Sequence, residues 1–299
     1  MSRHGRSPES MRHDVSCRID IMSQTSQRTG SAGSRVIDAA VELIRQRGLT
    51  VGLDHISLEE AIAASGVSRA TAYRHWPTKA DFLQQVLLRV VRNAELEPES
   101  DEDIAAVRDL VVEHREVLAT PEGRRTLVVE SLRVATESDF GRIAGSSAWR
   151  DHLALRATCS SLPPGDLRDA VAAELASSER AFTDRRARVY ARLPDVVGYR
   201  LVPWLDPDTG FTLMAEATGA LMSGLVARAA IVPSNPPLLM RALGSTTESP
   251  WTTEAYAVVA TVLSYLEPDP DVVWDAGRVE TAIARSFDLE DEARRLRVR

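Results

Sequence analysis

The sequence is poor in the residues that build disulfide frameworks, zinc sites and membrane spans. Only two of its 299 residues are cysteines, Cys17 and Cys159, which are too few and too far apart for a disulfide framework or a zinc site. A reducing cytoplasm is the simplest setting for such a chain. The most apolar stretch, 211–232, is interrupted by Glu216 and Arg228, and the 11 residues between these charges are too few to cross a bilayer.

Catalytic and cofactor motifs are also missing. None of the six histidines has the spacing of H-E-x-x-H zinc ligands. The sequence contains neither a glycine-rich phosphate loop nor a G-x-S-x-G nucleophile turn. From these missing motifs we predict no catalytic residues, no metal ligands and no cofactor. A signal peptide is not indicated either, because residues 1–33 carry charges throughout and lack its apolar core.

Basic residues are outnumbered, because 36 Lys+Arg stand against 43 Asp+Glu and the formal net charge is -7. This balance argues against a protein that coats nucleic acid over its whole surface. The deficit belongs to residues 93–299, at net -11, whereas 1–33 and 34–92 are each net +2. This uneven distribution of charge indicates that the two ends of the chain have different functions. The alternative is that the net charge varies along the sequence by chance. The single lysine is Lys79.

The periodicity of apolar residues predicts an all-α protein in three parts. Residues 1–33, rich in Ser, Arg and Gly, are predicted to be a flexible tail. Residues 34–92 form a small helical domain, and the acidic stretch 95–103 separates it from a larger helical body, 93–299. The helices predicted in the body are 102–119, 122–138, 146–159, 165–193, 208–231, 236–243, 251–266 and 273–287.

Caps and glycines delimit four helices in the second part. Serine and threonine favour helix N-caps, and glycine favours the position after a helix ends. Ser57 with Glu60 forms a capping box, and Gly48 and Gly66 are helix ends. The predicted spans are 34–47, 58–65, 68 to 73 or 75, and 79–93, with Ser34, Ser57, Ser68 and Thr78 as caps.

Residues 57–82 have the sequence features of a helix-turn-helix, and they read SLEEAIAASGVSRATAYRHWPTKADF. Gly66 permits a positive φ at a tight corner, and Val67 fills the space between the helices. The second helix is predicted to present Arg69, Thr71 and Arg74 outward. Ala72 and the ring of Tyr73 are predicted to face inward. Trp76 is expected in the core, because large aromatic side chains gain most from burial.

This segment resembles the DNA-binding domain of the tetracycline-repressor (TetR) family of bacterial regulators. The matching features are G-V-S at 66–68, T-A-Y at 71–73, R-H-W at 74–76 and P-T-K at 77–79, followed by Asp81 and Phe82. The resemblance covers about 34–92, roughly a fifth of the chain. One departure is Ala61-Ile62, where the family often has Ile-Ala, so local packing must differ.

The resemblance implies specific contacts with double-stranded DNA. Arginine can read guanine in the major groove, and an alanine methyl can touch a thymine methyl. Contacts to phosphates position the helix without reading sequence. The implied major-groove residues are Ser68, Arg69, Ala70 and Arg74, and the implied phosphate contacts are Ser57, Thr71, Tyr73, His75 and Lys79. A flexible arm with Arg28 or Arg35 could enter the minor groove, and His75 is alternatively a plain surface residue.

The resemblance also implies that the body dimerises and binds a small effector. Ala215, Gly219, Ser223 and Ala227 repeat every four residues in 208–231, a ridge that lets another helix approach closely. The helix 251–266 is apolar on most sides. We predict that these two helices and their symmetry mates form the homodimer interface, with burial inside one subunit as the alternative. Candidate effector contacts are Trp149, His152, Trp204, Phe211, Met214, Glu216, Met222, Trp251 and Tyr256.

The sequence thus predicts a cytoplasmic, homodimeric, ligand-responsive transcription regulator. A repressor of a pseudo-palindromic operator is favoured over an activator. Two other classes remain open at this point. One is a helical enzyme with the helix-turn-helix as an adaptor, which a bound cofactor would support. The other is a protein-interaction module, which a salt-independent partner without DNA affinity would support.

Overall fold

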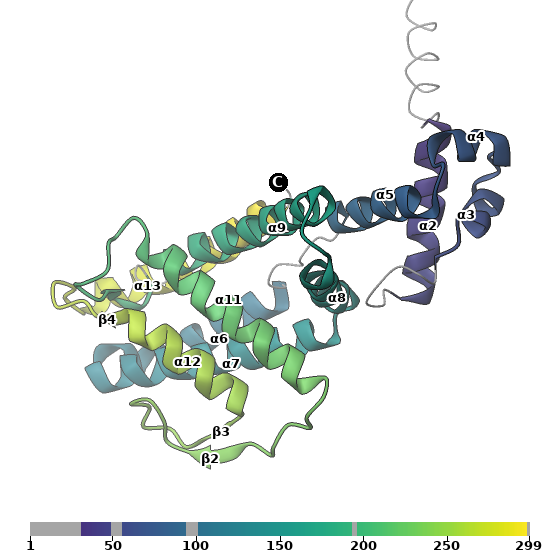
Figure 1. Cartoon of the computed structure of the whole chain (residues 1–299). Helices are drawn as coiled ribbons and strands as arrows, with labels where there is room; N and C mark the ends of the chain where they lie inside the picture. Colours follow the sequence, from purple (N-terminus) through teal and green to yellow (C-terminus); the bar gives the residue numbers. More distant parts are fainter. Residues whose placement is uncertain (1–30, 49–55, 94–100, 193–195, 298–299) are drawn as a thin grey trace, which may run out of the picture. The chain divides into compact units, whose positions relative to one another are not determined.

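The computed structural model describes residues 31–48, 56–93, 101–192 and 196–297, with the backbone alone at 101–104 and 289–297. The chain divides into two compact units, Met1–Asn93 and Ala94–Arg299. Both units are built from helices, apart from four three-residue strands among the described residues of the second unit. The fold class is therefore all-α, as the periodicity predicts (Figure 1).

Four helices are described in the first unit: α2 (Ala32–Arg47), α3 (Leu58–Ser65), α4 (Arg69–His75) and α5 (Lys79–Arg92). Helix α2 packs against the other three. Its buried face includes Val36 and Ala40, both fully buried, and α5 contributes Phe82 and Val86 to the same core. The N-cap of α2 is Ser31 and not Ser34, because the Ser31 hydroxyl accepts from the Ser34 backbone N–H at 3.2 Å.

The second unit contains seven described α-helices and a short 3₁₀-helix. Helices α7, α9, α11 and α12 form its centre, where α11 packs against α9, α12 and α7, and α6 and α13 pack against one another. The helices are α6 (Asp101–Glu113), η1 (Arg115–Ala119), α7 (Pro121–Gly145), α8 (Ser147–Ser161), α9 (Asp166–Tyr190), α11 (Gly210–Ala229), α12 (Thr253–Tyr265) and α13 (Ala276–Arg297).

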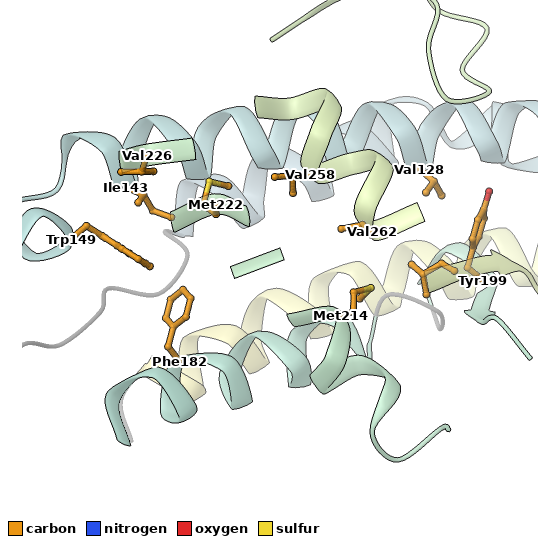
Figure 2. Packing of buried hydrophobic residues seen from close by; sticks show 11 residues of the cluster. Val128, Ile143, Trp149, Phe182, Tyr199, Met214, Met222, Val226, Val258 and Val262 are labelled. Atoms are coloured by element: carbon orange, nitrogen blue, oxygen red, sulfur yellow. The ribbon is translucent and has the colours of Figure 1, made fainter. Parts of the chain in front are cut away.

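The core of this unit brings together side chains from distant parts of the sequence. Val128 and Ile143 of α7 share a cluster with Met222 of α11 and with Val258 and Val262 of α12 (Figure 2). Trp149 and Phe182 join the cluster in an edge-to-face contact with ring centroids 5.4 Å apart. Helix α11 is long and apolar enough, by length and composition alone, to cross a membrane. Core helices of soluble proteins meet the same criterion.

Two short antiparallel strand pairs complete the unit. Strand β1 (Tyr199–Leu201) pairs with β4 (Leu266–Pro268), and β2 (Leu238–Met240) pairs with β3 (Ser249–Trp251). The helix predicted at 236–243 is wrong, because this segment contains β2 and a turn. Pro236 and Pro237 precede the strand, lack a backbone N–H and hold the chain extended. The predicted helix 102–119 is interrupted at His114, where the chain tightens into η1.

Candidate nucleic-acid interface

A left-handed corner joins α3 to α4. Ser57 caps α3 by accepting from the Glu60 N–H at 3.4 Å, and Gly66 ends it at φ 66° and ψ 16°. Ser68 then caps α4 by accepting from the Thr71 N–H at 3.3 Å. Val67, 7% exposed, fills the corner between the helices. The local signals in the sequence therefore form the helix-turn-helix where they predict it.

The inner face of α4 rests on the core of the first unit. Ala72 of α4 and Trp76, the C-cap residue that follows it, are each 1% exposed, which confirms the prediction that Trp76 is a core residue. The Trp76 ring meets Phe82 edge-on, with centroids 5.5 Å apart. A methyl group at Gly33 would lie 3.6 Å from the Trp76 ring, so α2 approaches this ring closely. These contacts fix how far α4 can turn about its own axis.

The outer face of α4 carries the residues expected at DNA. Arg69 and Arg74 are exposed, and Thr71 is half-buried. Tyr73 is 45% exposed, so the prediction that its ring faces inward is wrong. The remaining predicted contacts are exposed at Ser68, Ala70, His75 and Lys79 and half-buried at Ser57. Arg35 is exposed on α2, whereas Arg28 lies outside the described residues.

Glu59 of α3 binds two side chains of α4, and no pattern in the sequence indicates these contacts. Its carboxylate accepts a hydrogen bond from the Tyr73 hydroxyl at 2.5 Å and pairs with Arg69 at 3.1 Å. The hydrogen bond to Glu59 raises the pKa of Tyr73 above its ordinary value. These partners lie 10 and 14 residues from Glu59, across the corner, so no helical spacing could reveal them.

Several hydroxyl groups around α4 serve as helix caps, among them Ser57, which is predicted to touch a phosphate. The Ser68 and Thr71 hydroxyls are 2.9 Å apart, and Thr78 and Asp81 form a reciprocal capping box at the start of α5. A hydroxyl that accepts a backbone N–H keeps its own proton for donation. Capping by Ser57 therefore leaves it able to donate to a phosphate oxygen. Lys79 begins α5, where unpaired backbone N–H groups favour an anion.

The second unit contains a cavity of about 180 Å³. Side chains from α6, α7, α9, α11, α12 and α13 contribute to its wall. Of the predicted effector contacts, Met222 alone lines it. Trp149, His152, Met214 and Trp251 are buried elsewhere, Phe211 is half-buried, and Glu216, Trp204 and Tyr256 are exposed.

The two helices predicted at the dimer interface are each buried on one side within the chain. Helix α12 buries Val258, Val259 and Val262 but exposes Tyr256 and Ser264, so it is not covered all round by its own subunit. On α11 the small residues of the predicted ridge differ in burial. Ala215 and Ser223 are buried, Gly219 is half-buried and Ala227 is exposed.

Residues 36–86 match the family model described as bacterial regulatory proteins, tetR family. The match extends from α2 into α5 and so includes the whole α3–corner–α4 arrangement. The chain matches no curated protein and no solved structure. Residues 36–86 therefore form a helix-turn-helix DNA-binding domain of the tetR type, which supports a DNA-binding transcriptional regulator of that family.

Proposed function

We propose that this regulator is a repressor that binds a pseudo-palindromic operator as a homodimer and leaves it when a small molecule binds the second unit. The observation that carries the proposal is the two-sided character of α4. Its inner face is held by Ala72, Trp76 directly after its end anchors it in the core, and its outer face exposes Arg69 and Arg74. A helix held in this way can enter the major groove with its side chains directed at base edges.

The roles on the outer face follow from side-chain chemistry. Arg69 and Arg74 donate to O6 and N7 of guanine, and the Ala70 methyl contacts a thymine methyl, while Ser68 also faces the groove. Phosphate oxygens accept from the polar groups around the helix, which set its register. These phosphate contacts are Ser57, Thr71, Tyr73, His75 and Lys79, and the Tyr73 hydroxyl exchanges Glu59 for a phosphate oxygen, because it has a single proton to donate. The acidic body repels DNA, so contact is confined to a small patch on each subunit.

The homodimer forms through the outer faces of α11 and α12. On α11 this face exposes Ala220, Gly224 and Leu213, and on α12 it exposes Tyr256 and Ser264. Small side chains allow the helices of two copies to approach closely. A two-fold axis between the copies presents two α4 helices to successive major grooves, about 34–36 Å apart.

A matched pair of variants tests this interface. Gly224→Arg places a bulky charge where a Cβ meets nothing within 4 Å in the single chain, so the subunit should fold normally. Gly141→Arg makes the same change in α7, at another exposed glycine with open space. Sedimentation should show that Gly224→Arg dissociates and Gly141→Arg does not. A Gly224→Arg protein that remains dimeric would contradict the proposed interface.

Release requires that the effector prefer the conformation that does not bind DNA. A ligand shifts the equilibrium only by its difference in affinity between the two states. Such a regulator works in the cytoplasm, where bacterial DNA lies.

Selection of bound duplexes from a random pool tests the part of the proposal that concerns DNA binding. It should enrich two inverted half-sites about one helical turn apart. Recovery of unenriched sequences, or of one unpaired half-site, would contradict the proposal.

A further inference from the structure

An acidic side chain lies among the residues that are proposed to contact DNA. Glu59 is in the first turn of α3, two residues after Ser57, which is proposed to bind a phosphate. Helices α3 and α4 lie side by side (Figure 1), and the Glu59 side chain is 46% exposed. Its charge suits the N-terminus of α3, but Glu60 supplies the same charge in the same turn. A carboxylate at this place repels the phosphates of DNA, and a hydrogen bond accepted from a base offsets that repulsion.

The two oxygens of the Glu59 carboxylate have different partners on α4. Oε1 accepts from the Tyr73 hydroxyl at 2.5 Å, and Oε2 pairs with Nη2 of Arg69 at 3.1 Å. Tyr73 and Arg69 are about one turn apart on α4, and both side chains are exposed. The same carboxylate thus touches a residue proposed to bind a phosphate and a residue proposed to bind a base. In the complex with DNA it therefore lies at the edge of the groove, between the backbone and the bases.

Binding to DNA frees one of these two oxygens. The Tyr73 hydroxyl has a single proton, so it leaves Oε1 of Glu59 when it donates to a phosphate. Oε2 keeps its pair with Arg69, because a guanidinium carries several N–H donors and can serve Glu59 and a base together. An ionised carboxylate is an acceptor only, so Oε1 then requires a donor. Phosphates offer no donor, and the donor must therefore come from the edge of a base.

The major-groove edge of a G·C pair offers such a donor beside the atoms that Arg69 is proposed to bind. Guanine presents O6 and N7 as acceptors, and cytosine presents its N4 amino group as a donor next to O6. The two side chains present the complementary pattern, with donors on Arg69 and an acceptor on Glu59, 3.1 Å apart. A thymine or a guanine at the cytosine position would present an acceptor oxygen, which repels an ionised carboxylate.

We propose that Glu59 is a specificity-determining residue and that it reads one G·C pair together with Arg69. Arg69 donates to O6 and N7 of the guanine, and Oε1 of Glu59 accepts from N4 of the paired cytosine. The inference rests on the proposed function and deepens it, because it assigns a base to one more side chain of the same interface. At other sequences Glu59 only repels the DNA, so the carboxylate raises specificity and lowers non-specific affinity.

Selection of duplexes from a random pool, with the full-length protein and its variants, locates this base pair. The wild type should enrich a G·C pair in each half-site, and Arg69→Ala should lose the preference for it. In Glu59→Gln the preference for G·C over A·T at the same pair should fall at least about fivefold, because an amide can donate to thymine O4. Glu60→Gln should keep the wild-type preference, since Glu60 pairs with Arg47. An unchanged preference in Glu59→Gln, or an equal change in Glu60→Gln, would overturn the proposal.

Two methylated cytosines distinguish base reading by Glu59 from orientation of Arg69 alone. N4-methylcytosine keeps the proton that pairs with guanine and replaces the N4 proton in the groove, whereas 5-methylcytosine leaves both N4 protons in place. At the selected pair, N4-methylation should weaken wild-type binding at least about fivefold, and 5-methylation should weaken it less. Glu59→Ala should bind the unmodified and the N4-methylated duplex equally. An N4-methyl effect that is absent from the wild type, equal to the 5-methyl effect, or undiminished in Glu59→Ala would overturn the proposal.

The selection also separates this inference from the proposed function. Inverted half-sites in which no G·C pair depends on Glu59 overturn the inference and leave the repressor proposal intact. A single unpaired half-site that retains a G·C pair dependent on Glu59 and Arg69 supports the inference and contradicts the proposed dimer on DNA. Failure of the wild type to enrich any sequence contradicts the repressor proposal, and the inference is overturned with it.

Discussion

The hydroxyl of Tyr73 donates a hydrogen bond across 2.5 Å to the carboxylate of Glu59, which also pairs with Arg69 at 3.1 Å. One acidic residue of α3 thus orients two side chains on the outer face of α4. All three side chains are exposed, so these contacts contribute little to stability. They instead set the charge of the surface that meets DNA and the orientation of the Tyr73 and Arg69 side chains on it.

Glu59→Gln should change both the titration of Tyr73 and the binding of DNA. The amide oxygen still accepts a hydrogen bond, but the negative charge is lost. We expect the pKa of Tyr73 to fall toward its ordinary value, because the carboxylate partner holds it high. Non-specific DNA affinity should rise, because a charge that repels phosphates is gone, and the ratio of specific to random binding should fall. NMR titration of labelled tyrosine and fluorescence anisotropy measure the two effects.

Glu60→Gln is the control for this variant. It removes the same charge one residue along α3, but Glu60 pairs with Arg47 at 2.7 Å and does not contact Tyr73. The pKa of Tyr73 should therefore be unchanged in Glu60→Gln. An unaltered Tyr73 titration in Glu59→Gln would show that the hydrogen bond to Glu59 is absent in solution.

Arg69→Ala and Lys79→Ala should weaken DNA binding in different ways. Loss of a bidentate arginine contact to guanine costs about 1–3 kcal/mol and relaxes the preference at one position of the operator. Loss of a phosphate contact at Lys79 should weaken binding to all sequences alike and reduce the salt slope by about 1. Anisotropy titrations over a salt series on operator and random duplexes separate the two. An equal loss of affinity for all sequences in Arg69→Ala would show that Arg69 contacts the phosphate backbone of the DNA and not a base.

Gly66→Ala should loosen the corner between α3 and α4. Gly66 has φ 66°, and an added Cβ meets nothing within 4 Å, so the cost is conformational and not steric. An L-residue in this region costs about 1–2 kcal/mol, and asparagine tolerates it better than alanine. Hydrogen exchange in α3 and α4 should therefore rise more in Gly66→Ala than in Gly66→Asn. Equal protection in the wild type and both variants would contradict the left-handed corner.

Glu130→Gln should destabilise the second unit at the β2–β3 hairpin. The Glu130 carboxylate is 8% exposed and accepts from the Ser245 hydroxyl at 2.9 Å and the Ser249 hydroxyl at 2.8 Å. Hydrogen bonds to a charged group are worth about 1.5–3 kcal/mol, so we expect a loss of about 2 kcal/mol in unfolding free energy. Glu137→Gln is the control, because Glu137 is more exposed and does not bond to the hairpin serines. Chemical denaturation should rank the two variants in this order, and the reverse order would contradict the role of Glu130.

Structure that depends on residues close together in the sequence could be predicted, whereas structure that depends on distant residues could not. The α3–α4 corner could be predicted because caps and glycines act within three or four residues, as Ser57 on Glu60 shows. The inward placement of Tyr73 failed, because its position depends on Glu59 across the corner. The 236–243 helix failed because paired prolines and anchorage on Glu130 favour a hairpin. The cavity could not be located from the sequence, since its wall comes from six helices with no common spacing.

The affinity of the full-length protein for the inverted-repeat duplex enriched from the random pool, compared with a scrambled duplex of equal length and composition, tests the central claim most directly. At physiological salt, two α4 helices that read base edges should bind the enriched duplex at least about a thousandfold more tightly than the scrambled duplex. Arg69→Ala should reduce that preference by about tenfold or more. Equal affinities for the two duplexes would contradict sequence-specific DNA binding by this protein.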